Sequence, residues 1–272
     1  MHGEVRRIER LTPRMVRLVL GGDGLDGFVF TESTDQYVNA LFVPEGAAYT
    51  APFDLEVATA CSPEFRPVGR RYTIRSWDPV ERLVTIDFVV HGDVGIAGRW
   101  ANHAQVGDIL QFVGPHGAYA PDDTADWHLM AGDESAIPAI AASLERVRPG
   151  VPVLAVLVVD DEASELELEC PGDLQVSWVH RHADGDPDAV VRAVARLQFP
   201  DGRPDVFVHG EAGEIRAIRK HLLGARGIPR EGTSISPYWR RSFTDEKWRE
   251  TKRAWLAEVE ADLPSTDHAT TA

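Results

Sequence analysis

The chain contains the sequence Arg70-Arg71-Tyr72-Thr73-Ile74-Arg75-Ser76-Trp77-Asp78, in which cationic, aromatic and hydroxyl side chains alternate before Pro79. Such alternation is typical of a β-strand, and Asp-Pro is typical of the turn that ends one. Alternate residues of a strand share a face, so the two faces carry Arg71, Thr73 and Arg75 on one side and Arg70, Tyr72 and Ile74 on the other. A guanidinium group suits a pyrophosphate, while a phenol and a hydroxyl can contact a planar ring and its edge. A flavin dinucleotide needs these contacts, although an edge strand with solvated arginines has the same pattern.

Two later segments favour the flavin hypothesis. After an expected strand over 83–90, the chain passes from the turn His91-Gly92-Asp93-Val94-Gly95 into a short helical pattern. A turn of small residues at a helix start leaves backbone N–H groups free to hold phosphate. The next strand ends in a glycine-proline turn, Gly114-Pro115-His116-Gly117.

Composition narrows the class of protein. The chain has 272 residues, 43% of them hydrophobic, and can therefore form two modest domains with real cores. Its net charge of −15, with no basic stripe, argues against a nucleic-acid partner. No apolar run is long enough to span a bilayer, and residues 1–6 lack the apolar core of a signal peptide. We expect a cytoplasmic protein with no membrane partner, and we also expect a monomer.

The spacing of cysteines and histidines predicts no metal site. Cys61 and Cys170 are the two cysteines, and neither has a neighbour at metal-ligand spacing. An iron–sulfur cluster needs about four thiolates, so electron chemistry in this chain requires a bound cofactor. His180-x-His182 could suggest a metal, but no third ligand lies at local spacing.

Residues 1–121 are typical of a small antiparallel β-barrel. Alternating apolar residues predict one short helix and about six strands, over 4–11, 15–20, 37–43, 70–77, 83–90 and 108–113. Gly22-Asp23-Gly24-Leu25-Asp26-Gly27 matches the dinucleotide fingerprint GxGxxG. That fingerprint needs a helix directly after it, whereas Phe28-Val29-Phe30-Thr31 is strand-like, so we interpret the match as a turn.

The pattern changes after a proline- and charge-rich linker at 121–126. Residues 126–240 alternate strands with helices, and near-continuous apolar strands such as 153–159 predict a parallel sheet buried on both faces. Such a domain would bind a nicotinamide nucleotide at the carboxyl ends of its strands. An amphipathic helix is expected over 244–263, followed by a frayed tail over 264–272.

Polar residues stand at three of these strand ends. Gly132-Asp133-Glu134-Ser135 leads from the first strand into a helix, where Ser135 can cap the helix or hydrogen-bond near a flavin. His209-Gly210-Glu211 ends the fourth strand. Arg181 follows the third strand, where it can meet an adenosine 2′-phosphate, which would favour NADPH, or lie in solvent.

Several motifs occur in order along the chain: Arg70-x-Tyr72-Thr73-x-Arg75, His91-Gly92-x-x-Gly95, Gly114-Pro115-x-Gly117 and Gly132-Asp133-Glu134-Ser135-Ala136-Ile137-Pro138-Ala139-Ile140. In this series the chain resembles the siderophore-interacting proteins, the ferric-siderophore reductase branch of the ferredoxin-NADP reductase-like flavoproteins. The likeness covers nearly the whole chain, through Tyr238-Trp239-Arg240. It departs from the family pattern at Ile96, where proline is usual, and at Pro237 and Ser242, where glycine is usual. The resemblance implies a six-stranded FAD-binding barrel, a parallel-sheet α/β domain for NADPH or NADH, and a C-terminal helix.

The resemblance also implies roles for individual residues. Arg70 is expected at the FAD pyrophosphate, Tyr72 against the isoalloxazine ring and Thr73 at the ring edge. Other residues expected to bind a cofactor are Arg75, whose role we do not assign, the turn residues His91, Gly92, Gly95 and Ala97, and the strand-end residues Asp133, Glu134, Ser135, Arg181 and Glu211. Siderophores are often anionic, so Arg240 and Arg241 are expected at the substrate, although the acidic chain opposes an anionic ligand.

The implied activity is that of an FAD-dependent NAD(P)H oxidoreductase that reduces iron(III) held in a siderophore, so that weakly bound iron(II) is released. No residue is expected to act covalently. The ferric siderophore is the expected partner, and reduced ferredoxin could replace the nicotinamide as donor. Two alternatives stay open, namely another flavin-dependent electron transferase of the same fold and a siderophore-binding module without flavin.

Overall fold

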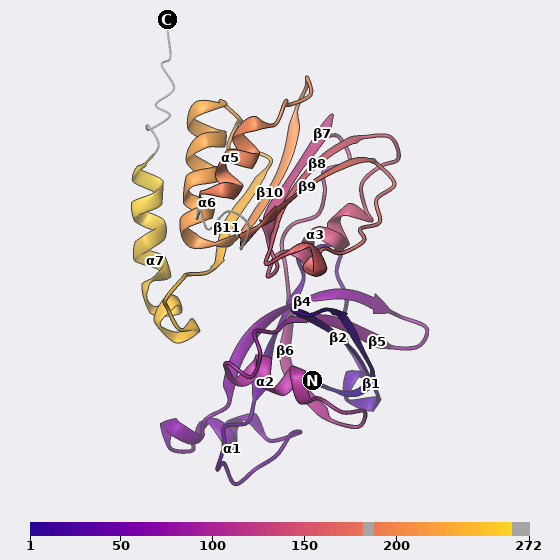
Figure 1. Ribbon diagram of the computed structural model, residues 1–272. Coiled ribbons are helices and arrows are strands. Elements are labelled where there is room, and N and C mark those ends of the chain that lie inside the picture. Colours follow the sequence, from indigo (N-terminus) through magenta and orange to yellow (C-terminus); the bar gives the residue numbers. More distant parts are fainter. Residues whose placement is uncertain (182–187, 263–272) are drawn as a thin grey trace, which may run out of the picture. The chain divides into compact units, whose positions relative to one another are not determined.

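The computed structural model describes residues 1–181 and 188–262, shown as a ribbon in Figure 1. His182 and the tail expected over 264–272 lie outside these residues. The chain divides into two compact units. Unit 1 comprises Met1–Pro121, Ile137–Val147 and Asp161–Pro171, and unit 2 comprises Asp122–Ala136, Arg148–Asp160 and Gly172–Ala272.

Unit 1 is built on a closed antiparallel barrel, which confirms the predicted architecture. Its strands are β1 (His2–Thr12), β2 (Met15–Gly21), β3 (Tyr37–Phe42), β4 (Val68–Asp78), β5 (Leu83–Val89) and β6 (Ile109–His116). They pair in the order β1-β2-β5-β4-β3-β6, and β1 closes the barrel on β6. The alternating Val16, Leu18 and Leu20 of β2 lie in the barrel core. The other face of this strand carries Arg17, whose guanidinium donates two hydrogen bonds to Asp87 of β5.

Short helices complete unit 1: η1 (Asp23–Leu25), α1 (Leu55–Thr59), η2 (Pro63–Phe65), α2 (Ile96–His103), α3 (Ile137–Leu144) and η3 (Glu162–Ser164). The GxGxxG match at 22–27 forms the η1 turn, as interpreted. The strand character expected over 28–31 is wrong, because these residues lie in no strand. Phe28 instead packs its ring against Trp77 and Phe112, so its apolar character serves the barrel core rather than a sheet.

Unit 2 contains the predicted parallel sheet. Its strands are β7 (Trp127–Asp133), β8 (Pro152–Val159), β9 (Asp173–His180), β10 (Pro204–Glu211) and β11 (Thr233–Trp239), in the order β11-β10-β7-β8-β9. The chain leaves β7 toward β8 and β9 and later returns to β10 on the other side of β7. Ligands of such sheets bind where the strand order reverses, outside the carboxyl ends of the strands.

Helices cover one face of this sheet (Figure 1). Helix α5 (Ala189–Arg196) packs against β8 and β9, while α6 (Ala212–Arg219) packs against β10 and β11 and continues into the π-helical η4 (Lys220–Ala225). The C-terminal helix α7 (Asp245–Ala261) is capped by the preceding Thr244, whose hydroxyl accepts a hydrogen bond from the backbone N–H of Lys247. Three buried side chains of α7, Trp248, Trp255 and Val259, cluster with Ala212 at the start of α6.

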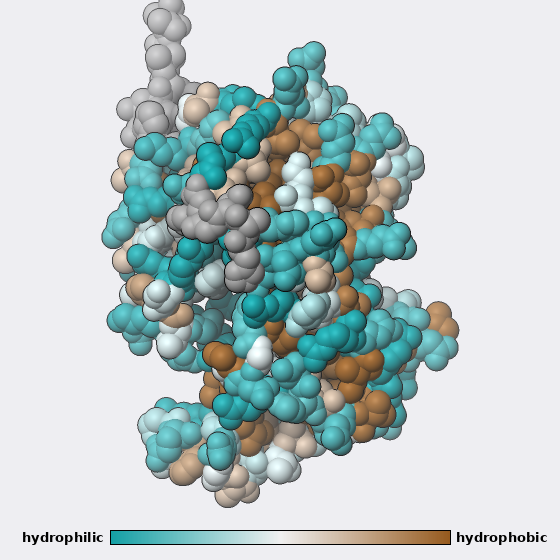
Figure 2. Space-filling model, viewed as in Figure 1, coloured by the Kyte–Doolittle hydropathy of each residue, from teal (hydrophilic) through white to brown (hydrophobic). Residues whose placement is uncertain are grey.

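One face of the surface carries both hydrophilic and hydrophobic residues (Figure 2). On the face shown in Figure 2, hydrophilic residues cover much of both units, as expected for a chain in which 26% of residues are charged. No helix among the described residues is long and apolar enough to cross a membrane.

Candidate functional site

Strand β4 places its tyrosine at the barrel core. Tyr72 is half-buried and packs against the core, with its ring 4.2 Å from the ring of Phe88 between centroids. Arg70, two residues earlier, shares this face and is also half-buried; its guanidinium donates to the backbone oxygen of Gly69. A flat phenol and a cation therefore lie along one face of a single strand.

Thr73 lies on the opposite face of β4, whereas the alternation expected as far as Arg75 is interrupted there, because the pairing of β4 with β5 shifts register between Ile74 and Ser76. Thr73 is buried, with 8% of its surface exposed, and its backbone pairs with Tyr37 of β3. Arg75 forms an ion pair with Glu145, just after α3, and keeps 15% of its side chain exposed. This ion pair gives Arg75 a structural partner within unit 1.

The turn before α2 is exposed and rich in glycine. Gly92 and Gly95 adopt φ angles of 63° and 75°, and a Cβ atom built on either would meet nothing within 4 Å. Gly95 is the N-cap residue of α2, and no side chain caps the helix there. Ala97 is buried in the barrel core, while His91 is exposed and contacts Arg14 at 3.2 Å. Open space beside a helix start that no side chain caps is compatible with a phosphate of FAD, and the face with Arg70 and Tyr72 is compatible with its pyrophosphate and ring.

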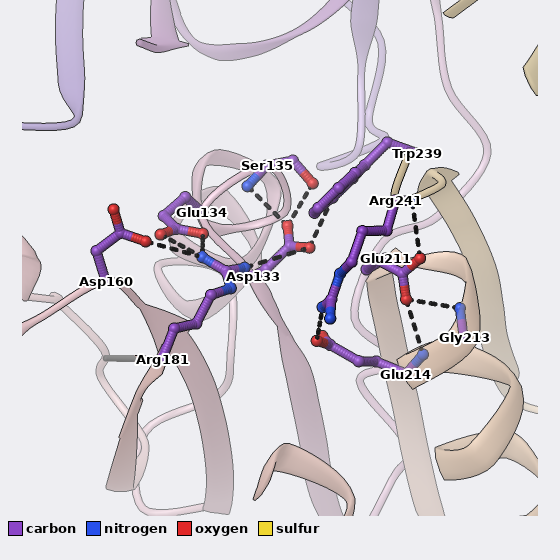
Figure 3. A network of polar contacts seen from close by, with 10 residues as sticks. All are labelled: Asp133, Glu134, Ser135, Asp160, Arg181, Glu211, Gly213, Glu214, Trp239 and Arg241. Carbon is purple, nitrogen blue, oxygen red and sulfur yellow. Dashed lines mark hydrogen bonds and ion pairs between the residues drawn. The ribbon is translucent and has the colours of Figure 1, made fainter. Parts of the chain in front are cut away.

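In unit 2, polar side chains gather at the carboxyl ends of the strands (Figure 3). Asp133, the last residue of β7, is 1% exposed. Its Oδ1 accepts from the backbone N–H of Ser135 at 2.9 Å and from the Ser135 hydroxyl at 2.5 Å. Its Oδ2 accepts from the indole N–H of Trp239 on β11 at 2.7 Å. One carboxylate thus joins the ends of two strands.

Glycine at position 210 makes this connection possible. Strand β10 lies between β7 and β11, and Gly210 of β10 has a φ of 147°. A Cβ atom added there would lie 2.9 Å from Asp133 Oδ2. Only glycine therefore leaves room for the carboxylate to reach past β10 to Trp239.

Arg181 follows β9 and is bound by carboxylates (Figure 3). Its Nη1 lies 2.6 and 2.5 Å from the two carboxylate oxygens of Glu134 and 3.5 Å from Asp160 Oδ1, while its Nη2 lies 3.8 Å from Asp133 Oδ2. Burial raises the pKa of Glu134, and the guanidinium of Arg181 opposes that rise. Only 25% of the Arg181 side chain is exposed, so the expected alternative of a solvated strand end does not describe it.

Glu211 and Glu214 organise the start of α6. Glu211 Oε2 accepts from the backbone N–H groups of Gly213 at 2.7 Å and Glu214 at 3.1 Å, which caps the helix, and its Oε1 accepts from the backbone N–H of Arg241 at 3.0 Å. The Arg241 guanidinium lies 3.0 Å from Glu214. Burial, with Asp133 next in size, raises the pKa of Glu214 to about 7. Arg240 instead stacks its guanidinium over the ring of Phe243 at 4.4 Å.

Sequence reasoning missed three members of this network: Asp160, Glu214 and the indole of Trp239. Asp160 directly follows the apolar run of β8 and could have been found as the polar residue at a buried strand end. Trp239 stands in a recognised motif but received no role. Its bond to Asp133 depends on strand order, which spacing along the chain does not reveal.

Both parts of the chain match known protein families. Residues 4–119 match the siderophore-interacting FAD-binding domain, and residues 125–242 match the siderophore-interacting protein family. The chain is 31% identical to ferric vibriobactin reductase ViuB of Vibrio cholerae over 93% of each chain. It is 30% identical to the NADPH-dependent ferric-chelate reductase of Escherichia coli, over 86% of this chain and 91% of that one. The crystal structure of a siderophore utilization protein from T. fusca superposes with a TM-score of 0.77 at 36% identity, covering 90% of this chain and 94% of the other. The chain therefore belongs to the siderophore-interacting protein family.

Proposed function

We propose that this protein is an FAD-dependent NAD(P)H oxidoreductase that reduces iron(III) held in a siderophore, so that the more weakly bound iron(II) is released. The observation that carries the proposal is that one chain combines a barrel bearing an open glycine turn with a parallel sheet bearing a polar carboxyl edge. The likeness to ferric vibriobactin reductase along 93% of the chain supports it.

Bound FAD supplies the step between a two-electron hydride donor and iron, which accepts one electron at a time. The protein's own groups bind and orient, and none acts covalently. We assign Arg70 to the FAD pyrophosphate, Tyr72 to the face of the flavin ring and Thr73 to its edge. We assign the phosphates and adenine side to the turn made of His91, Gly92, Gly95 and Ala97. Arg75 is the weaker candidate, because Glu145 already neutralises it.

On the nucleotide side, we assign the strand-end residues Asp133, Glu134, Ser135, Arg181 and Glu211 to the lining of the nicotinamide nucleotide site. Arg240 and Arg241 remain the candidate cations for an anionic siderophore. Arg240 is the stronger of the two, since Arg241 pairs with Glu214. We place the reaction in the cytoplasm and expect a monomer, with reduced ferredoxin as the alternative donor.

The test is an anaerobic visible spectrum of the purified protein, recorded before and after addition of NADH, NADPH or dithionite and then of a ferric siderophore. Flavin bands that bleach with a reductant and return with the ferric complex support the proposal. Absence of flavin after incubation with FAD would refute it and favour a siderophore-binding module. Flavin that bleaches but is not reoxidised by any ferric complex would favour another electron transferase of the same fold.

A variant pair tests the flavin assignment. Arg70→Ala combined with Tyr72→Ala should reduce bound FAD by at least about tenfold, because it removes both a charge-assisted contact to the pyrophosphate and a ring contact. Arg71→Ala is the matched control, since Arg71 lies between them in β4 but is exposed. The measurement is the ratio of flavin to protein absorbance after dialysis. Equal flavin content in both variants would contradict the assignment.

A further inference from the structure

The strand order of unit 2 indicates where an adenosine ribose would lie. Counting outward from β7, the strands β7, β8 and β9 are the first, second and third of the classic nucleotide-binding arrangement. In that arrangement an acidic residue at the end of the second strand hydrogen-bonds the ribose hydroxyls of NAD, whereas an arginine nearby accommodates the 2′-phosphate of NADP. Asp160, directly after β8, stands at the position of the acidic residue.

The arginine at this edge is engaged through one of its two terminal nitrogens. Nη1 of Arg181 contacts both oxygens of Glu134 and lies 3.5 Å from Asp160, whereas Nη2 is buried, lies 3.8 Å from Asp133 and has no hydrogen-bond partner among the described residues. Glu134 keeps only 5% of its side chain exposed and Asp160 only 12%. A phosphate that drew the guanidinium of Arg181 away from Glu134 would leave a buried carboxylate without its partner, which is costly.

The local charge also opposes a phosphate. Three carboxylates, Asp133, Glu134 and Asp160, surround the single guanidinium of Arg181, so the four groups together are acidic. Two cations, Arg240 and Arg241, directly follow β11, which lies beyond β10 on the other side of β7.

We infer that this protein takes NADH in preference to NADPH, with Asp160 and Glu134 as the residues that reject the 2′-phosphate and Asp160 as an acceptor for the free 2′-hydroxyl. The inference rests on the proposed function, since it concerns the donor of that reaction. It also separates this chain from the Escherichia coli relative, whose name states NADPH dependence. Arg181 acts here as the structural partner of Glu134 rather than as a phosphate ligand.

The test compares two probes that carry no nicotinamide, ADP-ribose and 2′-phospho-ADP-ribose, titrated calorimetrically into the FAD-loaded protein. ADP-ribose should bind about tenfold or more tightly, because the phosphate dianion meets the acidic edge at short range. The affinity for the phosphorylated probe should rise between about 0.02 and 0.2 M salt, since salt screens repulsion.

Variants assign the effect to residues. Asp160→Asn and, separately, Glu134→Gln should raise affinity for the phosphorylated probe by about tenfold, because each removes one negative charge. Asp173→Asn is the matched control; it removes an exposed carboxylate at the amino end of β9, and neither affinity should change. If Glu134→Gln does not fold, Asp160→Asn alone decides the question.

Equal or tighter binding of the phosphorylated probe by the wild-type protein would overturn the inference, and so would absence of binding by both probes. Reduction of the flavin by dithionite, followed by reoxidation with a ferric siderophore, tests the proposed function independently of either nucleotide. A protein that passes this second test but binds 2′-phospho-ADP-ribose better keeps the proposed function and refutes the preference for NADH. A protein that fails it but prefers ADP-ribose keeps the preference and loses the proposed function.

Discussion

Asp133 contributes hydrogen bonds that stabilise the carboxyl edge of the sheet in unit 2. Its carboxylate receives hydrogen bonds from Ser135 on one oxygen and from Trp239 on the other. Asp133→Asn should cost about 1–3 kcal/mol of the free energy of unfolding, because the amide nitrogen would face one of these donors in a buried place.

Trp239→Phe, which removes the indole donor, provides the partner for a double-mutant cycle with Asp133→Asn. Urea denaturation of the wild type and the three variants should give a coupling of about 0.5–3 kcal/mol, as expected for directly bonded groups. Strictly additive effects would mean that this hydrogen bond does not connect the two strand ends energetically.

Glu214 makes stability depend on pH. Burial raises its pKa from 4.5 to about 7, so the folded state holds the proton more tightly than the unfolded state does. This contribution to stability is fully present below the unfolded value near 4.5 and is lost as the pH rises through about 7. The Glu214→Gln variant has no carboxyl group to titrate at this position. Its free energy of unfolding, relative to that of the wild type, should therefore increase between pH 5 and pH 8. Urea denaturation at several pH values checks this, and parallel profiles for the two proteins would contradict it.

Among the secondary-structure elements, α7 depends on one buried face. Trp255 is 6% exposed and packs edge-on against Trp248, with 5.4 Å between the ring centroids. Trp255→Ala should destabilise unit 2 by about 3 kcal/mol, because a buried indole is replaced by a cavity. The neighbouring Leu256 is 39% exposed, and Leu256→Ala should cost less than about 1 kcal/mol. Thermal and urea unfolding measure the loss of stability in each of the two variants. Similar losses for Trp255→Ala and Leu256→Ala would show that the buried face of α7 does not stabilise the helix.

On the scale of the whole molecule, the two-part fold follows from local patterns. The alternation in β2 and β4 predicts barrel strands, and the apolar run of β8 predicts a strand buried on both faces, because sheet geometry imposes these periods. The apolar segment at 28–31 lies in no strand: Phe28 packs into the barrel core, whereas Val29 and Phe30 are exposed, since apolar composition alone does not require hydrogen bonding to a neighbouring strand.

The strand-end network was only partly predictable. The sequence indicates that polar residues at 133, 181 and 211 share one edge, because parallel strands end together. It does not indicate that β10 lies between β7 and β11, or that Asp133 reaches past Gly210 to Trp239. For Arg181 the sequence offers phosphate or solvent, whereas the structure provides carboxylates from two other strand ends.

The two units alternate along the chain, and this has a consequence for biosynthesis. Residues 137–147 and 161–171 belong to the barrel unit although they lie within the sequence of the sheet unit. During translation, the barrel unit therefore cannot be complete when the ribosome has passed Pro121; it requires the chain as far as Pro171. By then β7 and β8 have been synthesised as well. The first unit can accordingly be completed only after two strands of the second unit have been synthesised.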